Sequence, residues 1–238
     1  MADGTRPFLV EVAGVAGAGK STLARLICQG DAGCKRADLI HTRTLGHLVY
    51  VAHSIPRLLP LLAGNLALAP RLSWADFKLL VYVTEWHRFL NRERRYRRGV
   101  TVFDQGPVYA LVRLKAQAKG ITRSASFERW WNEMIEIWAG ELATVVYLDA
   151  SDRVLWDRIN GRAQPHTTKG EPASFAREFI ARYRRLFEET LDRIDRPGGP
   201  EILRFDTTET ASERIATAIR PILAEGGDRR VAEGKGRP

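Results

Sequence analysis

A glycine-rich run near the beginning of the sequence has the residue types and the spacing to bind a polyphosphate. Residues 14–21, GVAGAGKS, match the pattern G-x-x-x-x-G-K-[ST] at every fixed position. Glycines let the backbone turn its N–H groups toward an anion, and a helix that starts at such a loop adds the positive end of its dipole. In this pattern Lys20 reaches the β- and γ-phosphates of a nucleotide, and the Ser21 hydroxyl binds Mg²⁺. The residues predicted to contact ATP here are Gly14, Val15, Ala16, Gly17, Ala18, Gly19, Lys20, Ser21 and Thr22.

A carboxylate follows an apolar run far along the chain, where Asp104 ends the sequence VTVFD. In a parallel sheet, ligands lie beyond the carboxyl ends of the strands, so we expect Asp104 and Lys20 to face one crevice. There Asp104 could bind Mg²⁺, accept the proton of an acceptor hydroxyl, or do both. The alternative is a strand-end aspartate that only caps the following turn.

Two arginines, Arg158 and Arg162, stand four residues apart in a predicted helix that starts at Asp152. That spacing places them on one face of the helix. A loop rich in proline and glycine follows, which predicts a lid at about 158–173. Two guanidinium groups on a lid suit a closing step that stabilises the charge of a transferring phosphoryl group and excludes water. The alternative is a surface helix with paired charges.

Five β-rich runs alternate with helical patterns and would position these groups. Near-continuous apolar runs of this kind indicate a parallel sheet buried on both faces, in an α/β domain. The predicted strands are Phe8–Gly14, Ala37–Arg43, Val100–Gln105, Thr144–Ala150 and Glu201–Thr207.

Helical patterns fill the rest of a single predicted domain over 1–224. One helix, 126–142, has large apolar side chains at helical spacing, which favours a place in the core. A region at about 44–98 is expected to be helical and to lie on the acceptor side, and the segment 225–238 is predicted to be a disordered tail. The core side chains predicted on the helix 126–142 are Phe127, Trp130, Trp131, Met134, Trp138 and Leu142.

The composition indicates which kinds of partner and which cellular compartment to expect. The formal net charge of +9 suits an anionic partner, but the charge alone does not distinguish a nucleotide, a nucleic acid and a membrane surface. Two cysteines, Cys28 and Cys34, do not make a disulfide framework, so a reduced protein in the cytoplasm is expected.

One apolar segment, Leu48–Ala69, has the length of a membrane span. Prolines at 56 and 60, together with Gly64 and Asn65, interrupt it. We therefore expect a pair of buried or pocket-lining helices in place of a span. A peripheral contact with a membrane stays open.

The sequence resembles the nucleoside and nucleotide kinases of the P-loop class, nearest to the thymidylate kinase and deoxynucleoside kinase group. The resemblance runs from Phe8 to about Leu223 and is carried by GVAGAGKST, VFDQG, YLDAS with DRINGR, and FDTTETASERIATAI. It implies a three-layer P-loop NTPase fold, with ATP and Mg²⁺ in the crevice and an arginine-bearing lid. By position, Arg158 and Arg162 resemble lid arginines that touch phosphates and adenine. The turn with Thr208 resembles the loop that lies against the adenine.

The sequence departs from that family pattern at the end of the third strand. Those kinases usually have Asp-Arg or Glu-Arg there, whereas this chain has Asp104 followed by Gln105 and a glycine. The missing arginine normally helps to hold the acceptor, which weakens the case for a conventional thymidylate substrate, and Arg43, Arg88 or Arg92 could replace it. The apolar segment after Arg43 falls where these enzymes build their acceptor pocket, so the acceptor could be unusual or bulky. The predicted acceptor-binding residues are Arg43, Glu85, Arg88, Asp104 and Gln105.

These features favour an ATP-dependent small-molecule kinase. The sequence contains no N/T-K-x-D of a GTPase and no LSGGQ-like signature of a transporter ATPase. Its acceptor would be a nucleoside, a nucleotide or another hydroxyl-bearing metabolite, and a homodimer is compatible with the sequence. A nucleotide-dependent regulator that acts on a protein or membrane partner is the competing class. A nucleic-acid end kinase is supported only by the net charge.

Overall fold

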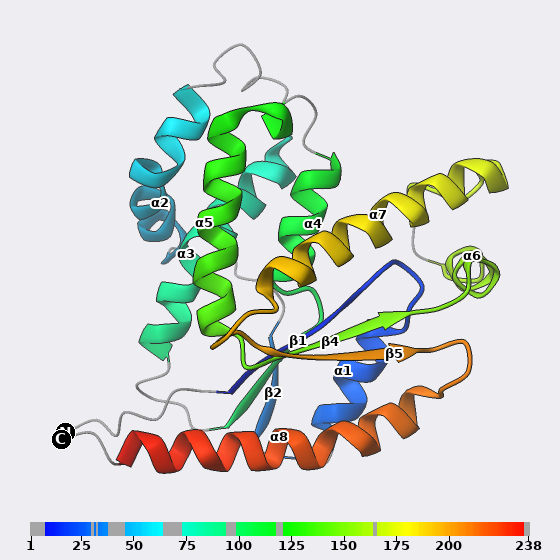
Figure 1. Ribbon diagram of the computed structural model, residues 1–238. Coiled ribbons are helices and arrows are strands. Elements are labelled where there is room, and N and C mark those ends of the chain that lie inside the picture. Colours follow the sequence, from blue (N-terminus) through cyan, green and yellow to red (C-terminus); the bar gives the residue numbers. More distant parts are fainter. Residues whose placement is uncertain are drawn as a thin grey trace.

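A five-stranded, all-parallel sheet forms the centre of the protein (Figure 1). The computed structural model describes residues 8–29, 31, 33–37, 46–63, 73–93, 99–117, 121–163 and 166–235. The strand order is β2-β3-β1-β4-β5, and every neighbouring pair is parallel. The predicted α/β fold is therefore confirmed. The strands are β1 (Phe8–Gly14), β2 (Cys34–Ala37), β3 (Val100–Phe103), β4 (Thr144–Asp149) and β5 (Glu201–Asp206).

The second strand does not lie where the sequence pattern placed it. β2 spans Cys34–Ala37 and pairs with β3 from Cys34↔Val100 to Ala37↔Phe103. The strand begins earlier than the predicted Ala37–Arg43 and shares only Ala37 with it in the described residues, because β2 is an edge strand with exposed Lys35 and Arg36 and no apolar run. Residues 38–43 lie outside the described part of the chain.

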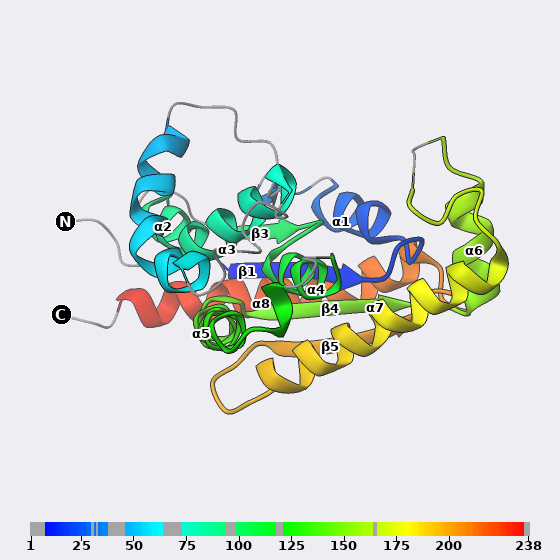
Figure 2. The same cartoon turned by 90° about the horizontal axis from the view of Figure 1, so that it is seen from above.

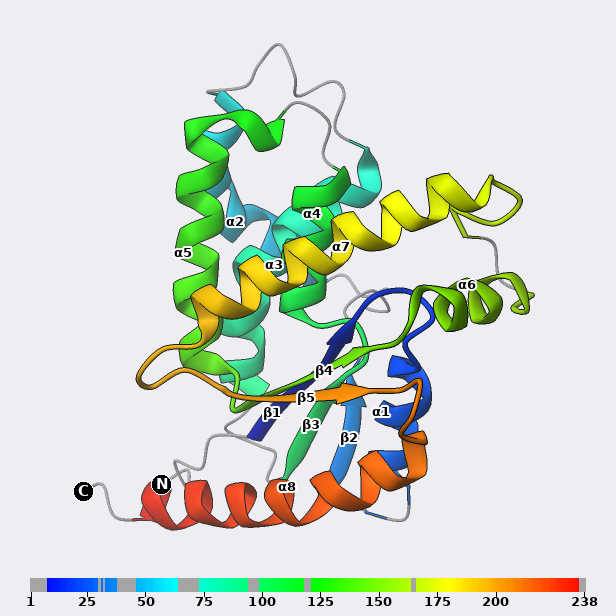
Figure 3. The same ribbon diagram turned by 45° about the vertical axis from the view of Figure 1, so that its right-hand side comes forward.

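Helices cover both faces of the sheet, which gives three layers (Figures 1 and 3). The helices α1 (Lys20–Cys28) and α8 (Ser212–Lys235) lie side by side on one face. On the other face α4 (Pro107–Gln117) packs against β1 and against α7 (Ala173–Ile194). The helix α6 (Asp152–Asn160) follows β4 at the carboxyl edge of the sheet.

A helical region made of α2 (Gly46–Ala63), α3 (Trp74–Glu93) and α5 (Ala125–Glu141) packs beside α4, with a short 3-10 turn at Ile121–Arg123 before α5. Seen from above, α2 and α6 lie at opposite ends of the molecule (Figure 2). The six side chains predicted for the core between 126 and 142 are all buried, which confirms that prediction.

The apolar segment after residue 45 forms one helix in its described part, where two were expected. α2 continues through both Pro56 and Pro60, so these prolines do not divide it. Leu58 faces the core, whereas Ile55 and Leu59 are exposed. In the ranges that the structure describes, no helix is both long and apolar enough to cross a membrane.

The carboxyl-terminal helix also runs further than the predicted domain. α8 continues to Lys235, although the structured domain was expected to end near 224.

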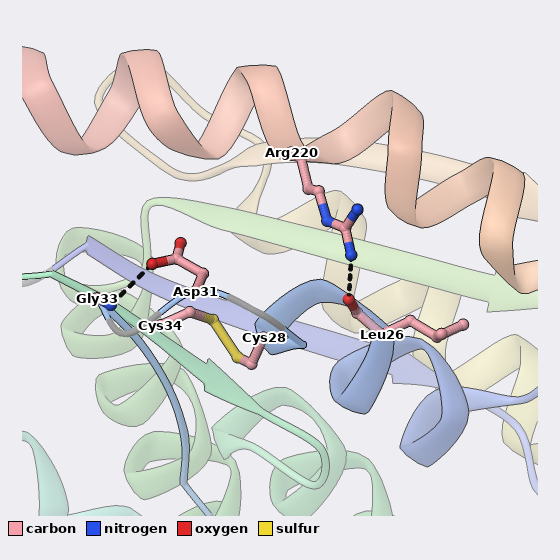
Figure 4. Close-up of a disulfide and its surroundings, with 6 residues drawn as sticks. All are labelled: Leu26, Cys28, Asp31, Gly33, Cys34 and Arg220. Atoms are coloured by element: carbon pink, nitrogen blue, oxygen red, sulfur yellow. Dashed lines mark hydrogen bonds between the residues drawn. A yellow bond between two sulfur atoms is a disulfide. The ribbon is translucent and has the colours of Figure 1, made fainter.

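Cys28 and Cys34 form a disulfide between the end of α1 and the beginning of β2 (Figure 4). Their Cα atoms lie 5.0 Å apart, because the short connection returns the chain beside α1. The expectation of free thiols was wrong. The cysteines therefore no longer give a reason to expect a reducing compartment. Figure 4 also shows Arg220 of α8, which donates to the carbonyl oxygen of Leu26 at 2.7 Å and so ties α8 to the same end of α1.

Candidate functional site

The glycine-rich loop, residues 14–21, joins β1 to α1 and lies against β4 and α6. Gly14 has φ +142°, and a Cβ there would lie 2.1 Å from the carbonyl oxygen of Leu148 in β4. Gly17 has φ +88°, and a Cβ there would lie 2.9 Å from the carbonyl oxygen of Leu155 in α6. Both positions require glycine, because side chains disfavour this backbone region and would also collide. The sequence therefore fixes a close contact between the loop and the predicted lid helix.

Lys20 is the first residue of α1, and its side chain turns back over the loop. Its Nζ donates a hydrogen bond to the carbonyl oxygen of Val15 at 2.8 Å and lies 5.8 Å from the centre of the Tyr109 ring. Although part of the residue is exposed, burial of the ammonium group lowers the pKa of Lys20 to about 8. The nearby Asp104 raises this pKa and Arg162 lowers it, so both charges are felt at Lys20.

Asp104 immediately follows β3, and its charge is close enough to Lys20 to raise the pKa of that lysine. Its Oδ1 atom is buried and has no hydrogen-bond partner among the described residues. A buried carboxylate oxygen without a partner is costly, so it needs a ligand cation or donor. Ser21 is exposed in the first turn of α1. These oxygen groups fit Mg²⁺, which commonly binds one or two protein oxygens together with nucleotide phosphates.

The described residues contain no cluster of three or more His, Cys, Asp or Glu side chains that could hold a metal on their own. A Mg²⁺ ion at Ser21 and Asp104 would therefore take its remaining ligands from the nucleotide and water.

Glu11 is a residue of this site that the sequence analysis missed. It lies in the middle of β1, is fully buried, and accepts hydrogen bonds from the backbone N–H groups of Val108 and Tyr109, both at 2.8 Å. Burial raises the pKa of Glu11 to about 7, against the opposing effects of these N–H groups and of Lys20. The available signal was a lone carboxylate inside an otherwise apolar strand.

Arg158 joins three parts of the site. Its Nη1 donates to the carbonyl oxygen of Gly17 at 3.3 Å and to Oγ1 of Thr207 at 2.9 Å, and its Nη2 donates to the Thr207 carbonyl oxygen at 2.8 Å. Arg158 therefore links α6 to the glycine-rich loop and to the turn after β5. In that turn, Thr208 accepts from the N–H of Ser151 at 2.7 Å, which holds it against the start of α6.

Arg162 does not share a helical face with Arg158, because α6 ends at Asn160. This part of the prediction was wrong, because the helix stops two residues before Arg162. Arg162 is exposed, and its charge lowers the pKa values of both Lys20 and His166. Of the two arginines, Arg162 is the one whose guanidinium donates no hydrogen bond in the described residues, and its charge acts on Lys20.

His166 lies in the loop between α6 and α7 and also faces Lys20. Its Nδ1 pairs with the Oγ1 of Thr168 at 2.8 Å, and its ring packs edge-on against Phe179 at 5.4 Å. Burial, and then the charges of Lys20 and Arg162, lower the pKa of His166. The imidazole is therefore neutral near pH 7 before an anion binds.

Arg184 of α7 holds the beginning of α6 in place. No short sequence motif indicated this role. It donates to Asp149 at the end of β4 at 2.6 Å and 3.2 Å, and to Asp152 at the start of α6 at 3.0 Å. The hydrogen bond to Asp149 is the main reason that the pKa of Arg184 is raised.

The predicted acceptor-binding residues lie on different elements of the fold. Glu85 is buried in α3 and forms ion pairs with Arg88 at 3.2 Å and with Arg57 of α2 at 3.7 Å. In the described part of the chain, no contact links this group to Lys20 or Asp104. Gln105 lies partly buried beside Asp104. Arg43 lies outside the described residues, as does the side chain of Arg92.

The structure defines a class by its fold: an α/β protein with a parallel five-stranded sheet, a glycine-rich loop between β1 and α1, and α6 at the carboxyl edge of the sheet. Solved structures share this fold. Thymidylate kinase from Candida albicans matches with a TM-score of 0.57 at 14% identity, over 95% of this chain and 94% of that chain. Deoxyadenosine kinase from M. mycoides with bound dCTP matches with a TM-score of 0.51 at 13% identity, over 91% and 100%.

A second structure of the M. mycoides enzyme, with the products dCMP and dCDP, has a TM-score of 0.50 at 14% identity, over 92% and 100% of the chains. The sequence matches no family model and no curated protein. The chain therefore has the fold of nucleoside and nucleotide kinases, as the resemblance implied, and this likeness establishes the fold alone.

Proposed function

We propose that the protein is an ATP-dependent small-molecule kinase. The observation that supports the proposal is a partly buried lysine ammonium on the glycine-rich loop that senses the charge of Asp104, whose carboxylate has a buried oxygen without a hydrogen-bond partner in the described residues. This arrangement offers a cation for a phosphate chain and an anion for a metal ion or a hydroxyl proton. The acceptor would be a nucleoside, a nucleotide or another hydroxyl-bearing metabolite.

The donor half of the site would hold ATP through the backbone N–H groups of the glycine-rich loop and through Lys20. Lys20 would exchange its hydrogen bond with the Val15 carbonyl for one with a phosphate oxygen. Because a polyphosphate is strongly anionic, its arrival would raise the pKa of Lys20 and keep the side chain protonated. Thr208 and its turn would lie on the adenine side.

The transfer would be in line. The acceptor oxygen forms a bond to the γ-phosphorus, the bond from that phosphorus to the β–γ bridging oxygen breaks, and ADP leaves. Asp104 accepts the proton of the acceptor hydroxyl or orients that hydroxyl. Mg²⁺, when bound by Ser21 and Asp104, would neutralise charge on the phosphate oxygens.

The lid would supply further positive charge. Arg162 would contact the transferring phosphoryl group, and His166 would donate a hydrogen bond to it once the anion favours its protonation. Arg158 would act by holding the Gly17 carbonyl and the Thr207 turn in place.

A screen for acceptor-stimulated ADP release tests the proposal, with nucleosides, nucleoside monophosphates and other phosphorylatable metabolites as candidates. Lys20→Ala should remove most of the transfer while the fold is retained, and Lys35→Ala, which removes an exposed lysine of β2, should not. Equal turnover in Lys20→Ala and the wild type would end the assignment. ATP hydrolysis that needs no acceptor, or that responds only to a macromolecule, would favour the regulator instead.

A further inference from the structure

We propose that Glu11 is a positioning residue of this site: its buried carboxylate fixes the turn that carries Asp104 and the first turn of α4 beside Lys20. The ionised form of Glu11 is then the form in which the site is assembled. The inference rests on the proposed function for its reaction readout, but the contacts that carry it are independent of the substrate.

The first contact is a cap supplied by another element. The two carboxylate oxygens of Glu11 accept separately, Oε2 from the N–H of Val108 and Oε1 from the N–H of Tyr109. These donors belong to the first turn of α4, nearly a hundred residues away in sequence. A helix has no internal partners for its first N–H groups, so a carboxylate that satisfies two of them fixes the position of the helix start.

The second contact is steric and involves the turn itself. A Cβ at Gly106 would lie 2.4 Å from the carboxylate of Glu11, so the backbone between Asp104 and α4 lies directly against it. Glu11 is also in register with Phe103, the residue before Asp104. The backbone of Glu11 therefore pairs with the strand just before Asp104, and its carboxylate contacts the chain just after Asp104, so we expect a change in the position of the carboxylate to move Asp104.

The third link is electrostatic. Among the described residues, the charge of Lys20 acts on the pKa of Glu11, and the charges of Asp104 and Arg162 act on the pKa of Lys20. A protonated Glu11 would present an O–H toward backbone donors and could keep only one of its two hydrogen bonds well. Since burial raises the pKa of Glu11 to about 7, loss of the proton and completion of the cap coincide near neutral pH.

Glu11→Gln tests the inference through the pH dependence of kcat. In the wild type we expect kcat to fall below about pH 7 as Glu11 gains a proton. Glu11→Gln should have a kcat lower by about tenfold or more at pH 8, as expected for a misplaced reacting group. The kcat of this variant should not show the acidic limb, that is, the fall below about pH 7. Its KM for ATP should stay within about twofold of the wild-type value, because the substitution leaves Lys20 and the glycine-rich loop in place. Asp76→Asn is the matched control, because Asp76 is a buried carboxylate in the first turn of α3.

A second measurement needs no acceptor. The Glu11 carboxylate raises the pKa of Lys20, so Glu11→Gln should lower the pH midpoint of Lys20 acylation, followed by mass spectrometry in the free protein. A cap with a structural role alone would lower Tm and leave the fall of kcat below pH 7 unchanged, which would overturn the inference. If the wild type showed no acceptor-dependent turnover, the proposed function would be wrong, but the measured pH midpoint of Lys20 acylation would still stand.

Gly106→Ala keeps the charge of Glu11 and displaces the turn. We expect kcat to fall by about tenfold or more while the acidic limb remains, because the titrating group is still present. A Gly106→Ala variant with normal kcat would show that Asp104 tolerates the displacement, and would overturn the inference even if Glu11→Gln failed to fold.

Discussion

Replacing Lys20 with methionine should abolish phosphoryl transfer and, at neutral pH, make the protein more stable. The physical reason is that the fold holds an ammonium group inside the glycine-rich loop, where burial lowers the pKa of Lys20 from 10.5 to about 8. Methionine has a similar length, carries no charge and has a higher preference for apolar surroundings. The site would thus be stabilised by losing the group that it needs for function.

The magnitude and its pH dependence follow from that shift. Below pH 8 both the folded and the unfolded chain hold the Lys20 proton, so the full burial cost is present. Between pH 8 and 10.5 the unfolded chain binds more protons, so the stability of the wild type rises with pH. At about 1.4 kcal/mol per pH unit, the cost is about 3 kcal/mol. Partial exposure and the lost bond to Val15 reduce the expected gain of Lys20→Met to about 1–2 kcal/mol at pH 7.

Urea denaturation at pH 7 and at pH 10.5 measures the difference, with Lys35→Met as a control at an exposed lysine of β2. Lys20→Met should exceed the wild type at pH 7 and lose that advantage at the higher pH. A variant that is less stable than the wild type at pH 7, with an unchanged pH dependence, would refute the argument that Lys20 is held at a cost.

Two further predictions concern contacts that join elements. Arg158→Ala removes three hydrogen bonds, each with a net value of about 1 kcal/mol, and should lower the Tm measured by calorimetry by several degrees. Arg162→Ala is the control, because this side chain is exposed and its loss should leave Tm almost unchanged. Equal Tm values in these two variants would contradict the linking role of Arg158. Cys28→Ser opens a loop with a sequence separation of 6 and should lower the free energy of unfolding by about 2 kcal/mol, measured in urea without reductant. If the native wild type had two titratable thiols without reductant, Cys28 and Cys34 would both be free, and this result would contradict the prediction.

The parts of the site that the sequence predicted are local along the chain. The glycine-rich loop is contiguous, and its pattern specifies both the backbone conformation and the neighbouring strand and helix. The strand that places Asp104 was also readable, because β3 is buried between two neighbours and its sequence is apolar. β2 was misplaced because an edge strand has one open side and need not be apolar. The disulfide between Cys28 and Cys34 was missed because a cysteine count carries no distance.

The contacts that hold the site together depend on residues far apart in sequence. Glu11 lies ninety-seven and ninety-eight positions from the two N–H groups that it binds, and Arg184 lies thirty-five from Asp149. No periodicity or motif encodes such a pair. What a sequence does show is an anomaly, such as a carboxylate in a buried strand. Because a buried charge is costly without partners, the anomaly alone indicates that partners exist, although it does not identify them.

The acceptor side shows why such anomalies must be followed to their partners before a role is assigned. Glu85 was one of the residues predicted to bind the acceptor. In the structure its charge is matched by Arg57 and Arg88, so it has a sufficient structural reason to be present. The Asp104 carboxylate, in contrast, keeps one buried oxygen without any partner in the described residues. A group whose polar atoms remain unsatisfied in the free protein has binding capacity left for a ligand, and Asp104 meets this criterion. The Nη1 atom of Arg57 beside Glu85 also has no hydrogen-bond partner in the described residues, so the criterion places candidate acceptor contacts at both groups.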